Sequence, residues 1–276
     1  TDTAQGQTTA EVVAEFLRSQ HLNVDIYTPS GLSTANTEAF SEGIDDLIVW
    51  LQNTIKPLRD NFTIYFNLVG GFKSLQGYMN TIGMFYADEI LYIFEGAGSE
   101  LITIPRLPIQ MDSDRLAPYT LKLALMDAGA GLSPDQTDGI PEAMLGEFDG
   151  KKVLSTWGKL TWDEAKTTLL SKDLLPWPKL TYTNDFRRDY TAVRDLGQRT
   201  KLQSILASVS YYLTESNGNP GALPSSINYT RYTGTEDIDH FRVDLSLRVS
   251  CRKVAEGLEL RYYGTHDHVE RSEKVR

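Results

Sequence analysis

The sequence has a single cysteine, Cys251, among its 276 residues, which excludes a disulfide framework within the chain. It also lacks any uninterrupted apolar run near the roughly 18 residues that a membrane-spanning helix needs. No secretory signal peptide is visible, so we expect a cytoplasmic protein with no membrane association. The chain begins at Thr1, without methionine and inside a structural pattern, and we therefore expect further sequence before it.

Basic residues are fewer than acidic ones, 27 Lys and Arg against 37 Asp and Glu, and the formal net charge is −10. The deficit is uneven along the chain. From Lys179 onward there are 15 basic and 13 acidic residues, whereas the preceding part has 12 basic and 24 acidic residues. A mildly basic C-terminal segment on an acidic body indicates nucleic-acid contact in that segment, but a solvated charged face gives the same balance.

Residues 1–109 alternate between helix-like and strand-like segments. Apolar residues at helical spacing predict helices at 8–21, 37–55 and 74–87. Short apolar runs predict strands at 24–27, 62–66, 89–94 and 101–105, and the first residues, with Gly6, predict the end of a strand and a turn. Strands separated by helices predict an α/β fold with a mostly parallel sheet covered on both faces.

A glycine-rich turn at 67–73 connects the predicted strand at 62–66 to the helix at 74–87. Its sequence is Asn67-Leu68-Val69-Gly70-Gly71-Phe72-Lys73. Glycines let backbone N–H groups approach a ligand, the following helix directs its positive dipole end there, and Lys73 adds a charge for phosphate. The pattern predicts an anion-binding turn at the carboxyl end of a strand; a plain strand-to-helix turn with a surface lysine is the alternative.

Residues 110–176 differ in character and predict a connector, helical or winged-helix-like. Short helices are expected at 121–126, 142–148 and 162–170, with turn-rich sequence between them. A simple helical spacer between two functional domains is the other interpretation. The sequence Pro-Trp-Pro at 176–178 then interrupts the chain and predicts a domain boundary.

Residues 177–276 predict a small α+β domain. Helices are expected at 186–196 and 200–213, and an alternating strand at 241–251 has a turn at Glu256-Gly257 and a returning strand at 258–263. In the alternating strand Arg242 and Arg248 share the polar, basic face. Cys251 is on the apolar face, where a buried inert thiol is expected.

The N-terminal part resembles the CARF domains of CRISPR-associated proteins, which are Rossmann-like sensors of cyclic oligoadenylate. The resemblance covers 1–109 and lies in the first six residues, the Asn-x-x-Gly-Gly-x-Lys turn and the two strands that follow. It implies a homodimer that binds one cyclic oligonucleotide, most often cyclic tetraadenylate, between two glycine turns. The family's first strand is absent from this sequence. The implied ligand-binding residues are Asn67, Gly70, Gly71, Phe72 and Lys73, together with Thr3 and Gly6.

The C-terminal part resembles RelE-type toxins, which are ribosome-dependent mRNA endonucleases. The resemblance lies in the two helices, the Asn-Gly-Asn-Pro loop, the strands around Arg242 and Arg248, and a final strand that ends at His268. It implies a small antiparallel sheet whose concave face holds mRNA. Basic residues there stabilise the phosphorane while the ribose 2′-OH attacks, with no metal and no cofactor.

The resemblance also implies roles for four residues. Arg248 matches a mid-sheet arginine that stabilises transition-state charge, and Arg242 matches a basic residue on the preceding strand. His266 is expected as acid or base, with the other role open and with a break or bulge of the strand at Gly264. His268 is a second candidate. The two histidines have no third ligand at metal-site spacing.

Together the two resemblances are those of a CRISPR-associated CARF–RelE fusion. They imply an antiviral-defence effector in which cyclic oligoadenylate binds the CARF dimer and activates cleavage of mRNA on ribosomes. Two alternatives remain open. One is a ring nuclease in which the CARF turn degrades the activator, and the other is a ligand-regulated transcription factor that binds DNA through the connector.

Overall fold

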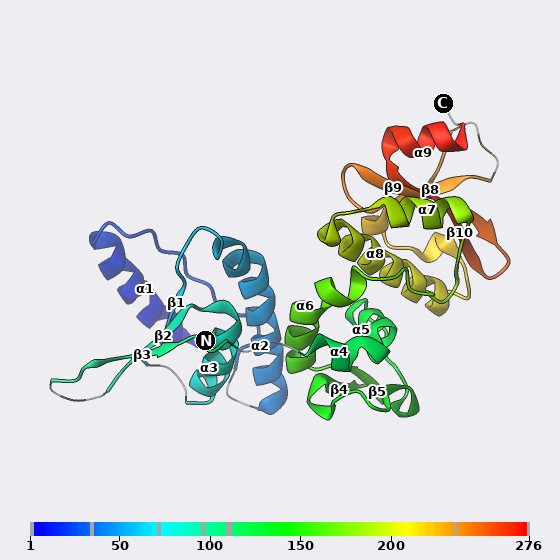
Figure 1. Ribbon diagram of the computed structural model, residues 1–276. Coiled ribbons are helices and arrows are strands. Elements are labelled where there is room, and N and C mark those ends of the chain that lie inside the picture. Colours follow the sequence, from blue (N-terminus) through cyan, green and yellow to red (C-terminus); the bar gives the residue numbers. More distant parts are fainter. Residues whose placement is uncertain are drawn as a thin grey trace. The chain divides into compact units, whose positions relative to one another are not determined.

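The computed structural model describes residues 3–33, 36–70, 73–94, 96, 98–108, 112–233, 235 and 237–274, except for the side chain of Glu38. The chain divides into two compact units, Thr1–Gln110 and Met111–Arg276 (Figure 1). The structure is a mixed α/β one, with a parallel and an antiparallel strand pair in unit 1 and a mainly antiparallel sheet in unit 2.

In its described residues, unit 1 has three α-helices and a three-stranded sheet of order β1-β2-β3. Its elements are α1 (Ala4–Ser19), α2 (Thr37–Trp50), a π-helical turn (Leu51–Ile55), a 3-10 turn (Lys56–Leu58), β1 (Tyr65–Asn67), α3 (Lys73–Tyr86), β2 (Glu89–Ile93) and β3 (Leu101–Pro105). Strand β2 is parallel to β1 and antiparallel to β3. The predicted helices and the strands at 62–66, 89–94 and 101–105 are therefore present within a few residues of their expected bounds.

Two expectations for the start of unit 1 are wrong. Gly6 lies inside α1 rather than in a turn, because the Thr3 hydroxyl accepts a hydrogen bond from the Gly6 N–H and begins the helix there. Residues 24–27 form no strand. Tyr27 instead stacks on Trp50 of α2 and donates a hydrogen bond from its hydroxyl to Asp46 at 2.5 Å.

The core of unit 1 lies between α2, α3 and the sheet. Its buried side chains include Ile44 and Ile48 from α2, Ile82 from α3 and Ile90 from β2. Helix α3 approaches the sheet closely at Gly83, where an added Cβ would lie 2.7 Å from the Ile90 side chain. This contact holds the C-terminal part of α3 against the sheet.

Unit 2 contains six helices, a five-stranded sheet of order β6-β10-β9-β8-β7 and the hairpin β4-β5 in its described part. The helices are α4 (Ser113–Leu116), α5 (Thr120–Asp127), α6 (Thr156–Leu170), α7 (Asn184–Ala192), α8 (Leu196–Glu215) and α9 (His266–Glu273). The strands are β4 (Leu145–Phe148), β5 (Lys151–Leu154), β6 (Leu180–Tyr182), β7 (Thr230–Arg231), β8 (Asp239–Arg242), β9 (Leu247–Val254) and β10 (Gly257–Thr265). Five 3-10 turns lie between them: Ala117–Tyr119, Pro134–Thr137, Glu142–Met144, Pro220–Ala222 and Ser225–Ile227.

One hydrophobic core extends through unit 2, from Leu116 to Tyr263. Trp177, at the predicted domain boundary, is 1% exposed and belongs to this core. Its indole N–H donates to the side-chain carbonyl of the buried Gln203, whose amide group donates to the carbonyl of Leu170 at 2.8 Å. Segments 112–176 and 177–274 are thus packed together.

Two secondary-structure predictions for unit 2 are wrong. Residues 142–148 form a 3-10 turn followed by β4 instead of a helix, because the Leu145–Phe148 backbone pairs with β5. The strand predicted at 241–251 is the hairpin β8-β9. The turn between these strands is closed by the Asp244 carboxylate, which accepts hydrogen bonds from the N–H groups of Ser246 and Leu247, both at 2.8 Å.

The five-stranded sheet has helices on both faces. Helix α7 packs on β10, and α9 packs on β9 and β10 (Figure 1). The side chains of Phe241, Val249 and Cys251 are buried in the main core. The opposite face carries His240, the arginines of β8 and β9, and the inner side of α9.

Candidate functional site

The glycine turn of unit 1 is held in place by side-chain amides. The side-chain Oδ1 of Asn67 accepts a hydrogen bond from the Val69 N–H at 3.1 Å. The Gln76 amide donates to the carbonyls of Leu68 and Gly70, each at 3.1 Å. Gly70 has a positive φ of 97° and open space around it, so its backbone is accessible. Residues 67–70 of the turn are thus held by hydrogen bonds, and the space beside Gly70 is open to a ligand.

A cavity of about 280 Å³ lies beside this turn. Apolar side chains, including Leu47 and Met79, and the polar groups of Asn67, Gln76 and Gly70 line it. Lys73 begins α3 and is exposed, so its charge adds to the positive end of the helix dipole. An apolar cavity with a few amide groups beside a cation is suited to a nucleobase next to a phosphate.

The other predicted ligand residues of unit 1 have different outcomes. Thr3 and Gly6 form the first turn of α1 and do not belong to the lining of this cavity. Gly71 and Phe72 lie outside the described residues. Asn67 and Gly70 line the cavity, and Lys73 follows as the first residue of α3. Among the described residues, these three are the remaining candidates for ligand binding.

In unit 2, Arg242 and Arg248 are register partners across the β8-β9 hairpin. Opposite residues of an antiparallel pair have their side chains on the same face of the sheet. The expectation that the two arginines share a face therefore agrees with the structure, although they lie on two strands. We call these two residues the arginine pair.

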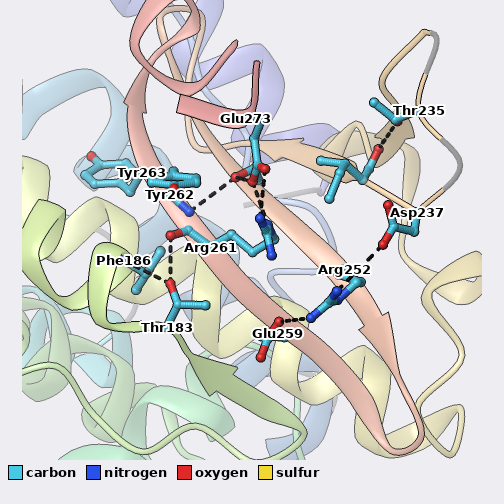
Figure 2. A network of polar contacts seen from close by, with 12 residues as sticks. Thr183, Phe186, Thr235, Asp237, Arg252, Glu259, Arg261, Tyr262, Tyr263 and Glu273 are labelled. Atoms are coloured by element: carbon cyan, nitrogen blue, oxygen red, sulfur yellow. Dashed lines mark hydrogen bonds and ion pairs between the residues drawn. The ribbon is translucent and has the colours of Figure 1, made fainter. Parts of the chain in front are cut away.

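Other arginines on this face are neutralised by acids (Figure 2). Arg252 contacts Glu259 at 2.9 Å and Asp237 at 3.7 Å. Arg261 donates two hydrogen bonds to the carboxylate of Glu273, at 2.8 and 3.1 Å. Within the described part of the chain, neither member of the arginine pair has an acidic partner. This part of the sheet therefore has an excess of positive charge and can bind an anion.

The guanidinium group of Arg248 is partly buried. Its Nε and Nη1 atoms are buried and have no hydrogen-bond partner among the described residues. A buried unpaired cation is costly unless a ligand neutralises it. Gly264 of β10 is the register partner of Arg248 on its other side, so the end of β10 lies next to this guanidinium group.

His240 and Tyr232 complete this part of the face. Their rings stack with centroids 4.1 Å apart. Burial, the charge of Arg248 and the charge of Arg242 lower the pKa of His240 to about 4. Burial raises the pKa of Tyr232 to about 12, with Glu270 acting in the same direction and Arg248 opposing it. At neutral pH both side chains are therefore uncharged beside the arginine pair.

The final strand ends before His268, the end that the resemblance to RelE-type toxins implies, and after residue 263, the end that the sequence pattern predicts. Strand β10 ends at Thr265, whose hydroxyl accepts a hydrogen bond from the His268 N–H and begins α9. His266 is the first residue of this helix, and its Nδ1 lies 3.0 Å from Glu270 Oε2. The strand is irregular between Leu260 and Tyr262, and not at Gly264 as expected.

His268 occupies a different environment from His266. Its Nε2 lies 3.2 Å from Asp189 Oδ2 of α7, and the same carboxylate oxygen accepts the Tyr263 N–H at 3.0 Å. Both His268 and Asp189 line a cavity of about 300 Å³. The structure thus brings Arg242, Arg248 and the start of α9 to one end of the sheet, and it turns His268 towards α7.

Sequence reasoning missed His240, Tyr232 and Glu270. His240 lies two residues before Arg242, so the period of a strand places it on the basic face. Glu270 lies four residues after His266, a helical spacing that becomes visible once Thr265 is identified as a helix cap. No signal in the sequence indicates Tyr232, which reaches the face through the pairing of β7 with β8.

Neither metal ligands nor membrane segments are evident in the described residues. No group of three or more His, Cys, Asp or Glu side chains there is arranged to hold a metal ion. None of the helices there combines the length and apolar character that a membrane span needs.

Each match among known proteins covers only part of the chain. Residues 1–107 match the family model described as CRISPR-associated protein (Cas_APE2256). The crystal structure of YafQ from E. coli strain BL21(DE3) is similar, with 16% sequence identity and a TM-score of 0.25 over 33% of this chain and 97% of YafQ. For the crystal structure of the E. coli DinJ–YafQ toxin–antitoxin complex, the identity is 13% and the TM-score 0.25, over 34% and 97%. Among curated proteins no match was found.

Proposed function

We propose that unit 2 is an endoribonuclease of the RelE type, which cleaves mRNA on the ribosome. The observation that carries this proposal is the arginine pair. Arg242 and Arg248 lie opposite each other on one face of the sheet, and neither has an acidic partner among the described residues. Two nitrogens of Arg248 are buried there and have no hydrogen-bond partner in the described part of the chain. Such a group binds a phosphodiester well, because a guanidinium matches two phosphate oxygens at once.

The reaction is an attack of the ribose 2′-OH on the adjacent phosphorus. A base takes the 2′-OH proton, the O2′–P bond forms, the P–O5′ bond breaks, and an acid protonates the leaving 5′ oxygen. The products are a 2′,3′-cyclic phosphate and a 5′-OH end. The arginine pair stabilises the extra negative charge of the phosphorane. His266, held by Glu270 at the start of α9, serves as acid or base, and the other role is unassigned.

Unit 1 is proposed to be the sensor. The cavity beside the glycine turn, with Lys73 at the start of α3, is suited to adenine and phosphate groups of a cyclic oligoadenylate, and cyclic tetraadenylate is the proposed activator. The match of residues 1–107 to a CRISPR-associated family supports a role in antiviral defence. We further propose a cytoplasmic homodimer. The activator must favour one dimer geometry, since equal affinity for two geometries shifts no equilibrium.

The test supplies translating ribosomes and a defined mRNA, with and without cyclic tetraadenylate, and maps the 5′ ends of the RNA. We expect new ends with 5′-OH groups only when the activator is present, and none with the Arg248→Ala variant. Absence of activator-dependent cleavage by the wild-type protein would overturn the proposal. Degradation of the activator that persists in Arg248→Ala, without mRNA cleavage in the wild type, would instead support a ring nuclease.

A further inference from the structure

A second basic cavity, of about 380 Å³, lies on unit 2 away from the arginine pair. It is bounded by the residues that follow α6, by α7 and by the first turn of α8. Lys172, Arg187 and Arg199 line it, and Asp173 is the one acid in its lining. The proposed reaction uses none of these residues.

Arg199 is held rigidly without being neutralised. Its guanidinium group donates hydrogen bonds to the carbonyls of Val193 at 2.9 Å, Ser171 at 3.1 Å and Thr191 at 3.3 Å. It also lies over the Tyr190 ring, 5.3 Å from the centroid. Carbonyl oxygens orient a guanidinium group and leave its positive charge unneutralised. Among the described residues, the contacts of Arg199 are to carbonyl oxygens and to the Tyr190 ring, and none is to an acid.

The two other cations are exposed and available. Arg187 lies over the ring of Tyr182 at 5.2 Å and, within the described chain, forms no ion pair. Lys172 contacts Asp114 at 3.7 Å, and the two side chains are 52% and 91% exposed. An ion pair this exposed contributes little and is easily exchanged for a ligand. The lining of the cavity therefore has three cations and one carboxylate, and a second carboxylate, Asp114, contacts Lys172 from outside it.

We infer that this cavity binds a backbone phosphate of the RNA on which unit 2 acts, and the choice of RNA rests on the proposed function. Helix α7 lies between this cavity and the start of α9. Arg187 and Thr191 on one side of α7 line this cavity, and Asp189 on another side contacts His268 of α9. An RNA strand that passes from the arginine pair round the end of β10, where His268 contacts Asp189, and then over α7 would reach the cavity. A rigid cation held by carbonyls and two mobile cations then bind its phosphate.

The test measures RNA binding by fluorescence anisotropy at several salt concentrations. The probe is a labelled single-stranded 2′-O-methyl oligoribonucleotide, which has no free 2′-OH to attack and stays intact. The test variant is the double substitution Lys172→Gln and Arg187→Gln. The matched control is Arg188→Gln, because Arg188 is 70% exposed on the same helix and pairs with Asp185 outside the cavity.

We expect the double variant to bind the probe at least fivefold more weakly. The slope of log K against log salt should fall by roughly 0.7 for each phosphate group that the protein no longer neutralises. The control should bind within twofold of wild type, and matching thermal unfolding curves would show that all three proteins are folded. Equal affinity of wild type and double variant, or equal weakening in the control, would overturn the inference.

Adenosine monophosphate as a competitor distinguishes the source of the phosphate. If it binds the wild-type cavity tightly while the double substitution leaves RNA affinity unchanged, the ligand is a free nucleotide and the RNA inference fails. Because the probe cannot be cleaved, this binding result is independent of catalysis. A protein that fails to cleave mRNA but shows the expected decrease in binding would refute the proposed reaction and keep this site.

Discussion

Arg242 and Arg248 lie directly opposite each other across the β8-β9 hairpin, on the same face of the sheet. Like charges at opposite positions destabilise a strand pair, and the buried nitrogens of Arg248 add a desolvation cost. A fold that retains both residues here gives up stability at this place. This is the pattern expected where a bound anion supplies the missing charge.

The first prediction concerns Arg248→Met, which replaces the guanidinium group with an apolar side chain of similar length. We expect mRNA cleavage to fall by about 10²–10³-fold, the usual effect of removing one donor to transition-state charge. The melting temperature should stay the same or rise, because the substitution removes a partly buried charge that has no ion-pair partner among the described residues. Cleavage assays and thermal unfolding of one protein preparation measure the two effects.

Arg252→Met is the matched control on the same strand and face. Arg252 pairs with Glu259 and Asp237, so its removal leaves acids unpaired and should reduce stability while changing cleavage by only a few-fold. Equal loss of cleavage in both variants would show that general positive charge, and not the position of Arg248, supports the reaction.

The sequence pattern does not predict the hairpin that places the two arginines opposite each other. Phe241, Val243, Leu245 and Leu247 continue one apolar alternation, which predicts a single strand. The structure breaks the strand because Asp244 captures the N–H groups of Ser246 and Leu247, and Leu245 becomes 93% exposed. A local side-chain bond thus outweighs the period of the apolar residues.

The second prediction tests this turn with Asp244→Ala. Burial acts to raise the pKa of Asp244, but hydrogen bonds from Ser246, Leu247 and Lys201 outweigh it and hold the pKa at about 2. The folded pKa is below the ordinary 3.8, so the carboxylate stabilises the fold above pH 3.8, and this contribution is lost as the pH falls towards 2. The variant should lose roughly 1–3 kcal/mol of unfolding free energy at pH 7.

Chemical denaturation at pH 7 and at pH 2 measures this difference. Asp244→Asn keeps an acceptor and should recover part of the stability at pH 7, with no added loss at low pH. A variant with wild-type stability at pH 7 would show that the turn forms without the Asp244 side chain.

The proposed catalytic face could be predicted from the sequence only in part. The two-residue period of a strand places Arg242, Arg248 and His240 on one face. The positions of the glycine turn and of α3 also follow from the sequence, through the two glycines and the helical spacing of apolar residues. The start of α9 was missed, because the resemblance favoured a continuing strand over the helix cap at Thr265. The core shared by Trp177 and Gln203 was also missed, since flanking prolines indicate a break in the chain.

The third prediction is that His240 stays neutral throughout the physiological range. Its pKa of about 4 follows from burial and from the charges of Arg248 and Arg242. Arg248→Met should raise this pKa towards 6.5, because one of the two charges is removed. Between pH 6.5 and 4 the unfolded chain binds a proton that the folded chain does not, so His240 makes the fold less stable as the pH falls through that range.

Titration of the imidazole signals by NMR, assigned with His240→Gln, tests this directly. A wild-type His240 that titrates near the ordinary value of 6.5 would contradict the prediction. If its pKa is low but unchanged in Arg248→Met, burial alone would account for it.

The fourth prediction separates the charge of the glycine turn from its shape. Lys73→Ala removes the exposed cation at the start of α3, and the loss of one charge-assisted hydrogen bond, worth roughly 1.5–3 kcal/mol, should weaken cyclic tetraadenylate binding about 10–100-fold. Gln76→Leu removes the amide that holds the carbonyls of Leu68 and Gly70, so it should weaken binding by loosening the turn. Because only Lys73 contributes charge, only Lys73→Ala should reduce the salt dependence of the affinity.

Calorimetric titrations at two salt concentrations distinguish the effect of charge from the effect of turn shape. Basal RNA binding by unit 2 should be unchanged in both variants. Equal salt dependence in wild type and Lys73→Ala would place the activator's phosphate groups elsewhere.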